Sequence, residues 1–423
     1  MEWRVRTDSK RRRRGLAAAA AVLGGVLVLS ACNGGDDKAG GGSGDKTAKS
    51  QADVDAAAAK DTSKARIVIA PKDGATNVGL NNAAVTVTDG TLTKVELKTS
   101  EGTAVEGKIA ADGKSWKPEA ALKRSQKYSL SASAKDDGGK EAHENASFTT
   151  VSPENSFIGS FTPEDGSKVG VGMPVSIDFN KPIKDKKAVQ AAINVTSSSG
   201  QEVVGHWFGD QRLDFRPDQY WAANSTVTMK MKLDGVQGAP GVVGVQDRTA
   251  TFQIGRSQVS TVDAKTKKMT VTRDGQVVKT IPISAGSPAN PTYNGQMVIS
   301  EKFKETRMDG ATVGFKDGDG KGEYDIKDVP HAMRLSNSGT FIHGNYWGDD
   351  SIFGSANTSH GCVGLNDAKG ANDPNQPGAW FFDNSLIGDV VTVVNSPDKT
   401  IKPDNGLNGW NLSWADWKAG SAV

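Results

Sequence analysis

The chain has 423 residues, of which 24% are charged and 6% aromatic, and this length is enough for two to four domains with separate cores. Its formal net charge is +2, but residues 1–31 alone carry +5, so the remainder carries −3. A weakly acidic remainder gives no reason to expect nucleic acid as a partner.

The N-terminal segment is predicted to be a lipoprotein signal peptide. Basic residues 10–14 precede an apolar run that is as long as the core of a signal sequence and short for a membrane span. The sequence LSAC, which ends at Cys32, resembles the lipobox of bacterial lipoproteins. The resemblance implies that residues 1–31 are removed and that Cys32 is lipidated. An ordinary signal peptide is the alternative.

Residues 32–64 are polar and rich in Gly and Ala, which predicts a flexible tether. Two similar segments follow, starting with APKDGATNVGLNNAAVTV and TPEDGSKVGVGMPVSIDF. Each places short alternating apolar runs between Gly, Pro and Asp turns, which is typical of a β-sandwich. We therefore predict two immunoglobulin-like domains, at 65–151 and 152–255, without a cluster of catalytic residue types.

Residues 256–396 are predicted to form a third, mainly β domain. Asp274-Gly275 is a hairpin turn signal between two alternating runs, and the sequence GAWFFDNSL predicts a helix. The tail, 397–423, contains Trp410, Trp414 and Trp417 at spacings of four and three. This spacing predicts one helical face that packs against the third domain; a ligand-binding aromatic stripe is the alternative.

Cys362 lies in the sequence TSHGCVGLND and is the only cysteine besides Cys32. If Cys32 is lipidated, Cys362 has no disulfide partner within the chain, so a reactive thiol is the favoured interpretation. A thiol attacks carbonyls as a thiolate and needs a nearby base, for which His360 and His343 are candidates. Gly361 allows a turn whose N–H groups could face an oxyanion.

Two other interpretations of this region remain open. His343, His360 and Cys362 could bind zinc, with His331 as an extra ligand, although a structural site usually has a second cysteine. Alternatively, the cysteine could be buried and inert, but the polar residues that precede it argue against burial.

The pattern HG…SHGCVGL resembles the signature of the L,D-transpeptidases, and the domain order resembles that of their mycobacterial-type members. The resemblance implies a mainly β chain with two immunoglobulin-like β-sandwich domains, a β-rich L,D-transpeptidase catalytic domain and a short Trp-rich C-terminal tail. It also implies that peptidoglycan stem peptides are the donor and the acceptor. The lipobox predicts that the chain reaches the membrane through a lipid anchor, and we expect no cofactor or metal.

The resemblance also implies roles for single residues. Cys362 would be the nucleophile, His343 its base, and the carbonyl of Gly344 the group that orients the imidazole. His360 and Gly361, with Cys362 itself, would stabilise the oxyanion. The implied substrate-binding residues are Met308, Tyr324, Ser338, Gly339, Ser359 and Gly364.

One position departs from the family pattern. Gly364 stands where family members commonly carry Asn or Arg, so a polar contact is missing unless Asn366 or another group supplies it. The predicted activity is formation of 3→3 peptidoglycan cross-links with release of D-Ala. The alternatives are an L,D-carboxypeptidase, which would use the same residues, and a non-catalytic wall-binding lipoprotein. A papain-like peptidase is disfavoured because its Cys precedes its His.

Overall fold

The computed structural model describes residues 62–423. The predicted signal peptide, the lipidation at Cys32 and nearly all of the tether lie outside the described residues. The described part is mainly β, as the sequence predicts, with few short helices. None of the helices in residues 62–423 is long and apolar enough to cross a membrane.

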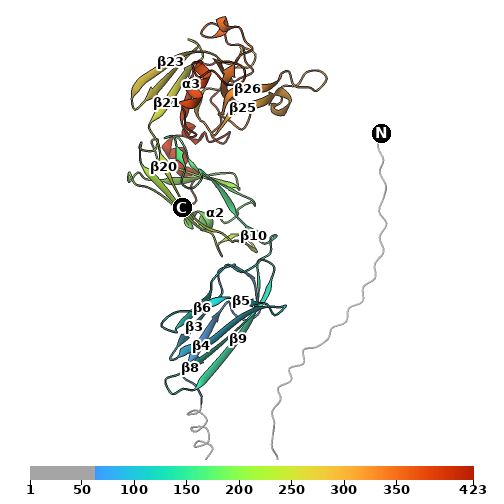
Figure 1. Ribbon diagram of the computed structural model, residues 1–423, viewed down its shortest axis with the longest axis vertical. Helices are drawn as coiled ribbons and strands as arrows, with labels where there is room; N and C mark the ends of the chain where they lie inside the picture. Colours follow the sequence, from blue (N-terminus) through green and yellow to red (C-terminus); the bar gives the residue numbers. More distant parts are fainter. Residues whose placement is uncertain (1–61) are drawn as a thin grey trace, which may run out of the picture. The chain divides into compact units, whose positions relative to one another are not determined.

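The first sandwich consists of two sheets with strand orders β1-β3-β7-β6 and β2-β9-β8-β4-β5 (Figure 1). Its core contains Trp116 and a stacked pair of rings, Tyr128 and Phe148, whose centroids are 5.6 Å apart. Its strands are β1 (Arg66–Ala70), β2 (Ala75–Val78), β3 (Ala84–Thr88), β4 (Thr91–Thr99), β5 (Ala104–Val105), β6 (Gly107–Ile109), β7 (Ser115–Pro118), β8 (Lys127–Lys135) and β9 (Glu141–Thr150). Alternation of buried and exposed residues along β8 explains why the sequence predicts a sandwich.

The second sandwich consists of sheets β11-β13-β16-β15 and β12-β20-β17-β14, with a small third sheet, β10-β19-β18. Helix α2 (Lys186–Ala191) begins at Asp185, whose carboxylate accepts a hydrogen bond from the N–H of Ala188. The strands are β10 (Ser156–Phe157), β11 (Gly159–Thr162), β12 (Lys168–Val169), β13 (Val175–Phe179), β14 (Ile193–Ser197), β15 (Val204–Phe208), β16 (Arg212–Arg216), β17 (Thr226–Lys232), β18 (Gln237–Ala239), β19 (Val242–Gly244) and β20 (Asp247–Ile254).

A nine-stranded mixed sheet with the order β24-β29-β21-β22-β23-β28-β27-β26-β25 follows. The predicted hairpin at Asp274-Gly275 is confirmed, because both residues have positive φ and join β22 to β23. The predicted helix is α3 (Pro377–Asp383), which packs against β26, β27 and β28. The strands are β21 (Gln258–Asp263), β22 (Lys268–Arg273), β23 (Gln276–Ser284), β24 (Gly295–Val298), β25 (Glu301–Asp309), β26 (Asp325–Arg334), β27 (Phe341–Asn345), β28 (Val363–Asn366) and β29 (Val390–Val394). Two short 3₁₀ helices, η1 (Gly310–Val313) and η2 (Asp350–Ile352), lie in its loops.

The prediction of one helical face for the three tail tryptophans is wrong. Trp410 lies in the 3₁₀ helix η3 (Gly409–Asn411), whereas Trp414 and Trp417 lie in α4 (Trp414–Ala419). Leu412 is extended and Ser413 caps α4, so the chain changes direction between the two helices.

The predicted packing of the tail is only partly right. Asn411 Oδ1 accepts a hydrogen bond from the N–H of Gln296, at the start of β24, so the tail does contact the nine-stranded sheet. The tryptophans, however, pack on the second sandwich. Trp410 Nε1 donates to the carbonyl of Gly172 at 2.7 Å, and Trp417 Nε1 donates to that of Val204 at 2.9 Å.

The buried guanidinium of Arg216, on β16, explains this placement. It lies 4.6 Å from the ring of Trp410, 4.3 Å from that of Trp417 and 5.5 Å from that of Trp414. One of its nitrogens also donates to the carbonyl of Leu412 at 3.0 Å. Cation–π attraction and hydrogen bonds thus hold the tail, and a long-range contact of this kind leaves no periodic signal in the sequence.

Candidate functional site

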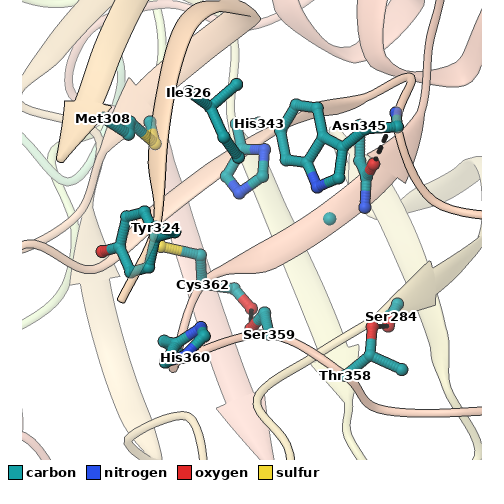
Figure 2. A pocket seen from close by; sticks show the side chains of 12 residues that line it. Ser284, Met308, Tyr324, Ile326, His343, Asn345, Thr358, Ser359, His360 and Cys362 are labelled. Carbon is teal, nitrogen blue, oxygen red and sulfur yellow. Dashed lines mark hydrogen bonds between the residues drawn. The ribbon is translucent and has the colours of Figure 1, made fainter. Parts of the chain in front are cut away.

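The catalytic residue types predicted from the sequence meet where β27 and β28 run side by side. These strands are parallel, and His343 is paired with Gly364. Cys362 immediately precedes β28, so the pairing places its thiol and the His343 imidazole in one cavity (Figure 2). The side chains and backbone that line this cavity belong to Ser284, Met308, Tyr324, Ile326, His343, Asn345, Trp347, Thr358, Ser359, His360, Cys362 and Gly364.

The Cys362 side chain is half-buried and forms no disulfide. Its Sγ lies 3.6 Å from the carbonyl oxygen of Gly339, close enough for the thiol to donate a weak hydrogen bond. Burial raises the pKa of the thiol to about 11, although a hydrogen bond with the backbone of Phe341 acts in the opposite direction. At neutral pH the thiol of Cys362 is therefore protonated.

His343 is buried, and its tautomer follows from one hydrogen bond. Nδ1 lies 2.8 Å from the carbonyl oxygen of Gly344. A carbonyl can only accept, so Nδ1 carries the proton and Nε2 keeps its lone pair. Burial lowers the pKa of the ring, partly offset by this hydrogen bond and by the charge of Asp367. His343 is thus a neutral imidazole, suited to accept a proton.

The indole of Trp347 stacks on the imidazole of His343, with the ring centroids 5.6 Å apart and the planes at 17°. In the described part of the chain, no hydrogen bond yet joins the imidazole to the Cys362 thiol. The thiol points instead to the carbonyl of Gly339.

His331 does not join this cavity. Its Nδ1 lies 2.7 Å from Oδ2 of Asp367, and both residues are buried. A Cβ on Gly344 would lie only 2.1 Å from the same carboxylate oxygen, so Asp367 packs directly against the backbone that orients His343. His331 therefore does not converge with His343 and Cys362 as the zinc interpretation requires. No group of three potential metal ligands is found within residues 62–423.

Ser359 and Gly361 shape the turn before the nucleophile. The Ser359 hydroxyl donates to the carbonyl of Cys362 at 2.6 Å and accepts from the N–H of Gly361 at 3.1 Å. Gly361 has a φ of +117°, a conformation that favours glycine. The N–H of Gly361 is therefore occupied, while that of Cys362 has no acceptor among the described residues.

The hairpin formed by β25 and β26 covers one side of the cavity. Met308 lies at the end of β25 and Tyr324 just before β26, and both line the cavity. The rings of Tyr324 and Phe315 lie 5.0 Å and 5.2 Å from that of His360. His360 Nε2 is also 3.1 Å from a carboxylate oxygen of Glu323, so the hairpin is linked to the motif turn. The sequence reading missed Phe315 and Glu323, which lie in a Gly/Asp-rich stretch without periodicity.

Ser338 and Gly339 lie beside a neighbouring cavity, which shares His360 with the first. The tail holds Ser338, because Asn405 Nδ2 donates to the Ser338 hydroxyl at 2.8 Å. The carbonyl of Gly339 faces the thiol. The structure therefore places Gly339 next to the Cys362 thiol, but neither Ser338 nor Gly339 lines the cavity that contains His343.

Known proteins resemble this chain over both the sandwiches and the nine-stranded domain. A model of the L,D-transpeptidase catalytic domain matches residues 257–393, and a model of a bacterial Ig domain matches residues 75–237. The chain is 33% identical over 351 residues to L,D-transpeptidase 2 of Mycobacterium tuberculosis, with 83% of each chain covered.

Two further similarities are found. L,D-transpeptidase 5 of Mycobacterium tuberculosis is 30% identical, and the alignment covers 85% of this chain and 77% of the relative. A solved structure of the LD transpeptidase LdtMt1 in complex with imipenem is 29% identical, with a TM-score of 0.47, over 57% of this chain and 100% of the other.

Proposed function

This chain belongs to the L,D-transpeptidase family, and from that premise we propose that it forms 3→3 peptidoglycan cross-links through a thioester on Cys362. The donor is a stem tetrapeptide, and the leaving group is its terminal D-Ala. The acceptor is the side-chain amine of a diamino acid on a second stem.

The observation that carries the proposal is the pairing of a protonated thiol with a neutral imidazole in one cavity. Nε2 of His343 removes the proton from Cys362 Sγ, and the thiolate attacks the carbonyl carbon of the third stem residue. The imidazolium then gives its proton to the departing D-Ala amine, and a thioester remains. Attack by the acceptor amine breaks the thioester, and His343 returns the amine's proton to the thiolate.

The oxyanion of each tetrahedral intermediate needs hydrogen-bond donors. The free N–H of Cys362 is suited to this role, because it follows a turn that the Ser359 hydroxyl and the positive φ of Gly361 hold in shape. Since Ser359 already occupies the N–H of Gly361, Gly361 contributes mainly through its conformation.

The hairpin residues Met308 and Tyr324 line the cavity and bind the donor there. Burial raises the pKa of the Tyr324 hydroxyl to about 12, so it remains a hydrogen-bond donor at neutral pH. The LSAC sequence supports removal of residues 1–31, lipidation of Cys32 and a site of action outside the cytoplasmic membrane.

The test is intact-mass spectrometry of the purified protein with a stem tetrapeptide and, separately, with a carbapenem. We expect a covalent adduct on the wild type in both cases and none on Cys362→Ala. An adduct that persists in Cys362→Ala, or a wild type that is never acylated, contradicts the proposal. Adding an acceptor amine separates the two chemistries: a transpeptidase forms the dimer, whereas an L,D-carboxypeptidase releases only the tripeptide.

A further inference from the structure

Gly364 lies in the cavity at the position where the family resemblance implies a polar side chain, and its backbone does not require glycine. Its φ is not in the left-handed region. A Cβ built on it would meet its nearest neighbours, the carbonyl oxygen of Ser284 and Nδ2 of Asn345, at 3.4 Å and 3.6 Å. These are ordinary van der Waals distances, so a methyl group fits. A longer side chain would have to compete with Asn345 for space.

The orientation of the Asn345 amide follows from its hydrogen bonds. Its Oδ1 accepts from the N–H of Trp347 at 3.1 Å and from the N–H of Gly348 at 2.9 Å. Two donors at one atom identify that atom as the oxygen, so the opposite atom is the NH₂ group. In Figure 2 this nitrogen lies on the other side of the amide from the dashed hydrogen bond.

The NH₂ group of Asn345 lies beside Gly364, which lines the same cavity as His343 and Cys362. Asn345 and His343 are two residues apart on β27, so their side chains share one face of the strand, and both line the cavity with Cys362. Within the described residues, no hydrogen bond is donated by Asn345 Nδ2. Asn366 cannot take this role as it stands, because its Nδ2 donates to Asp350 at 3.3 Å and it does not line the cavity.

We propose that Asn345 binds the donor stem peptide, by donating from Nδ2 to one of its carbonyl or carboxylate oxygens. Asn345 thereby supplies a polar contact from β27, beside the position of Gly364 on β28. Glycine at 364 leaves room for this amide. The inference rests on the proposed function and identifies Asn345 as a residue that binds the donor stem peptide.

Three variants test it, with the rate of tetrapeptide acylation measured by mass spectrometry. Asn345→Ala removes the amide and is expected to slow acylation about 10-fold, the effect of one hydrogen bond. Asn345→Asp still accepts the hydrogen bonds from the N–H groups of Trp347 and Gly348, so the loop that follows β27 should stay intact. It loses the Nδ2 donor, however, and we expect a similar fall in the acylation rate. Adding Gly364→Asn to Asn345→Ala restores a donor in the vacated space and is expected to recover most of the rate.

The matched control is Asn366→Ala, two residues beyond Gly364 on the same strand, which should acylate like the wild type. Asn345→Asp acylating at the wild-type rate would overturn the inference, and so would a double variant no faster than Asn345→Ala. Those outcomes leave the proposed function intact, because the wild type is still acylated. A wild type that tetrapeptide does not acylate overturns both.

Discussion

The Nδ1 atom of His331 lies 2.7 Å from Oδ2 of Asp367, and these residues are only 4% and 5% exposed. The carboxylate also packs against Gly344, whose carbonyl accepts the Nδ1–H of His343. The pair therefore supports, from the core side, the backbone that sets the tautomer of the proposed base.

Removing one partner of this buried pair should destabilise the protein strongly. We expect Asp367→Ala to lower the free energy of unfolding by about 1–3 kcal/mol, because the buried imidazole of His331 is left without its hydrogen-bond partner. Urea unfolding followed by circular dichroism measures this. The control is Asp328→Ala, which breaks an exposed pair with Lys369 and should change stability little. Equal losses of unfolding free energy in the two variants would show that the buried pair contributes no more to stability than the exposed pair.

The pH dependence of acylation should reflect His343. Burial lowers the pKa of its imidazole below the ordinary value of 6.5, so the ring is already neutral at pH 7 and becomes protonated only at more acidic pH. The acylation rate should therefore be level around pH 7 and fall on the acid side of pH 6.5. Stopped-flow measurements of kcat/KM for carbapenem acylation test this. A rate that is still rising through a midpoint above pH 7 would contradict it.

Replacing the base should slow the chemistry without unfolding the protein. His343→Gln keeps a side chain that can donate to Gly344, but it has no lone pair of comparable basicity. We expect the acylation rate to fall about 10²–10⁴-fold, the range for a lost general base. His143→Gln, an exposed substitution in the first sandwich, is the matched control. An unchanged rate in His343→Gln would mean that another group activates Cys362.

Arg216 should anchor the tail. Arg216→Ala removes the cation beneath Trp410 and Trp417 and also the donor to Leu412. We expect a loss of a few kcal/mol in unfolding free energy and a red shift of tryptophan emission as the indoles become hydrated. Arg248 is an exposed residue of the same sandwich. Arg248→Ala should change neither the unfolding free energy nor the tryptophan emission. A tail that keeps its emission spectrum without Arg216 would show that packing alone holds it.

The sequence was sufficient to predict those elements whose pattern lies within a short stretch of the chain. Alternating apolar residues predicted the sandwiches, Asp274-Gly275 predicted a hairpin, and GAWFFDNSL predicted α3. The residues around Cys362 could also be predicted as a candidate site, because His360, Gly361 and the thiol are adjacent in the chain. His343 was predicted as the base because the family motif includes it, and this motif spans the connection between the paired strands β27 and β28.

Residues that act through long-range contacts had no such signal. Asp367 reaches His331 across 36 positions, and Arg216 reaches Leu412 across 196. Asn345 is two residues from His343 in sequence, yet its role depends on the space above Gly364, which only the pairing of β27 with β28 creates. Periodicity and motifs depend on residues that are close together in the sequence, so they predict only local structure. Packing between strands brings together side chains whose relation no spacing in the sequence encodes.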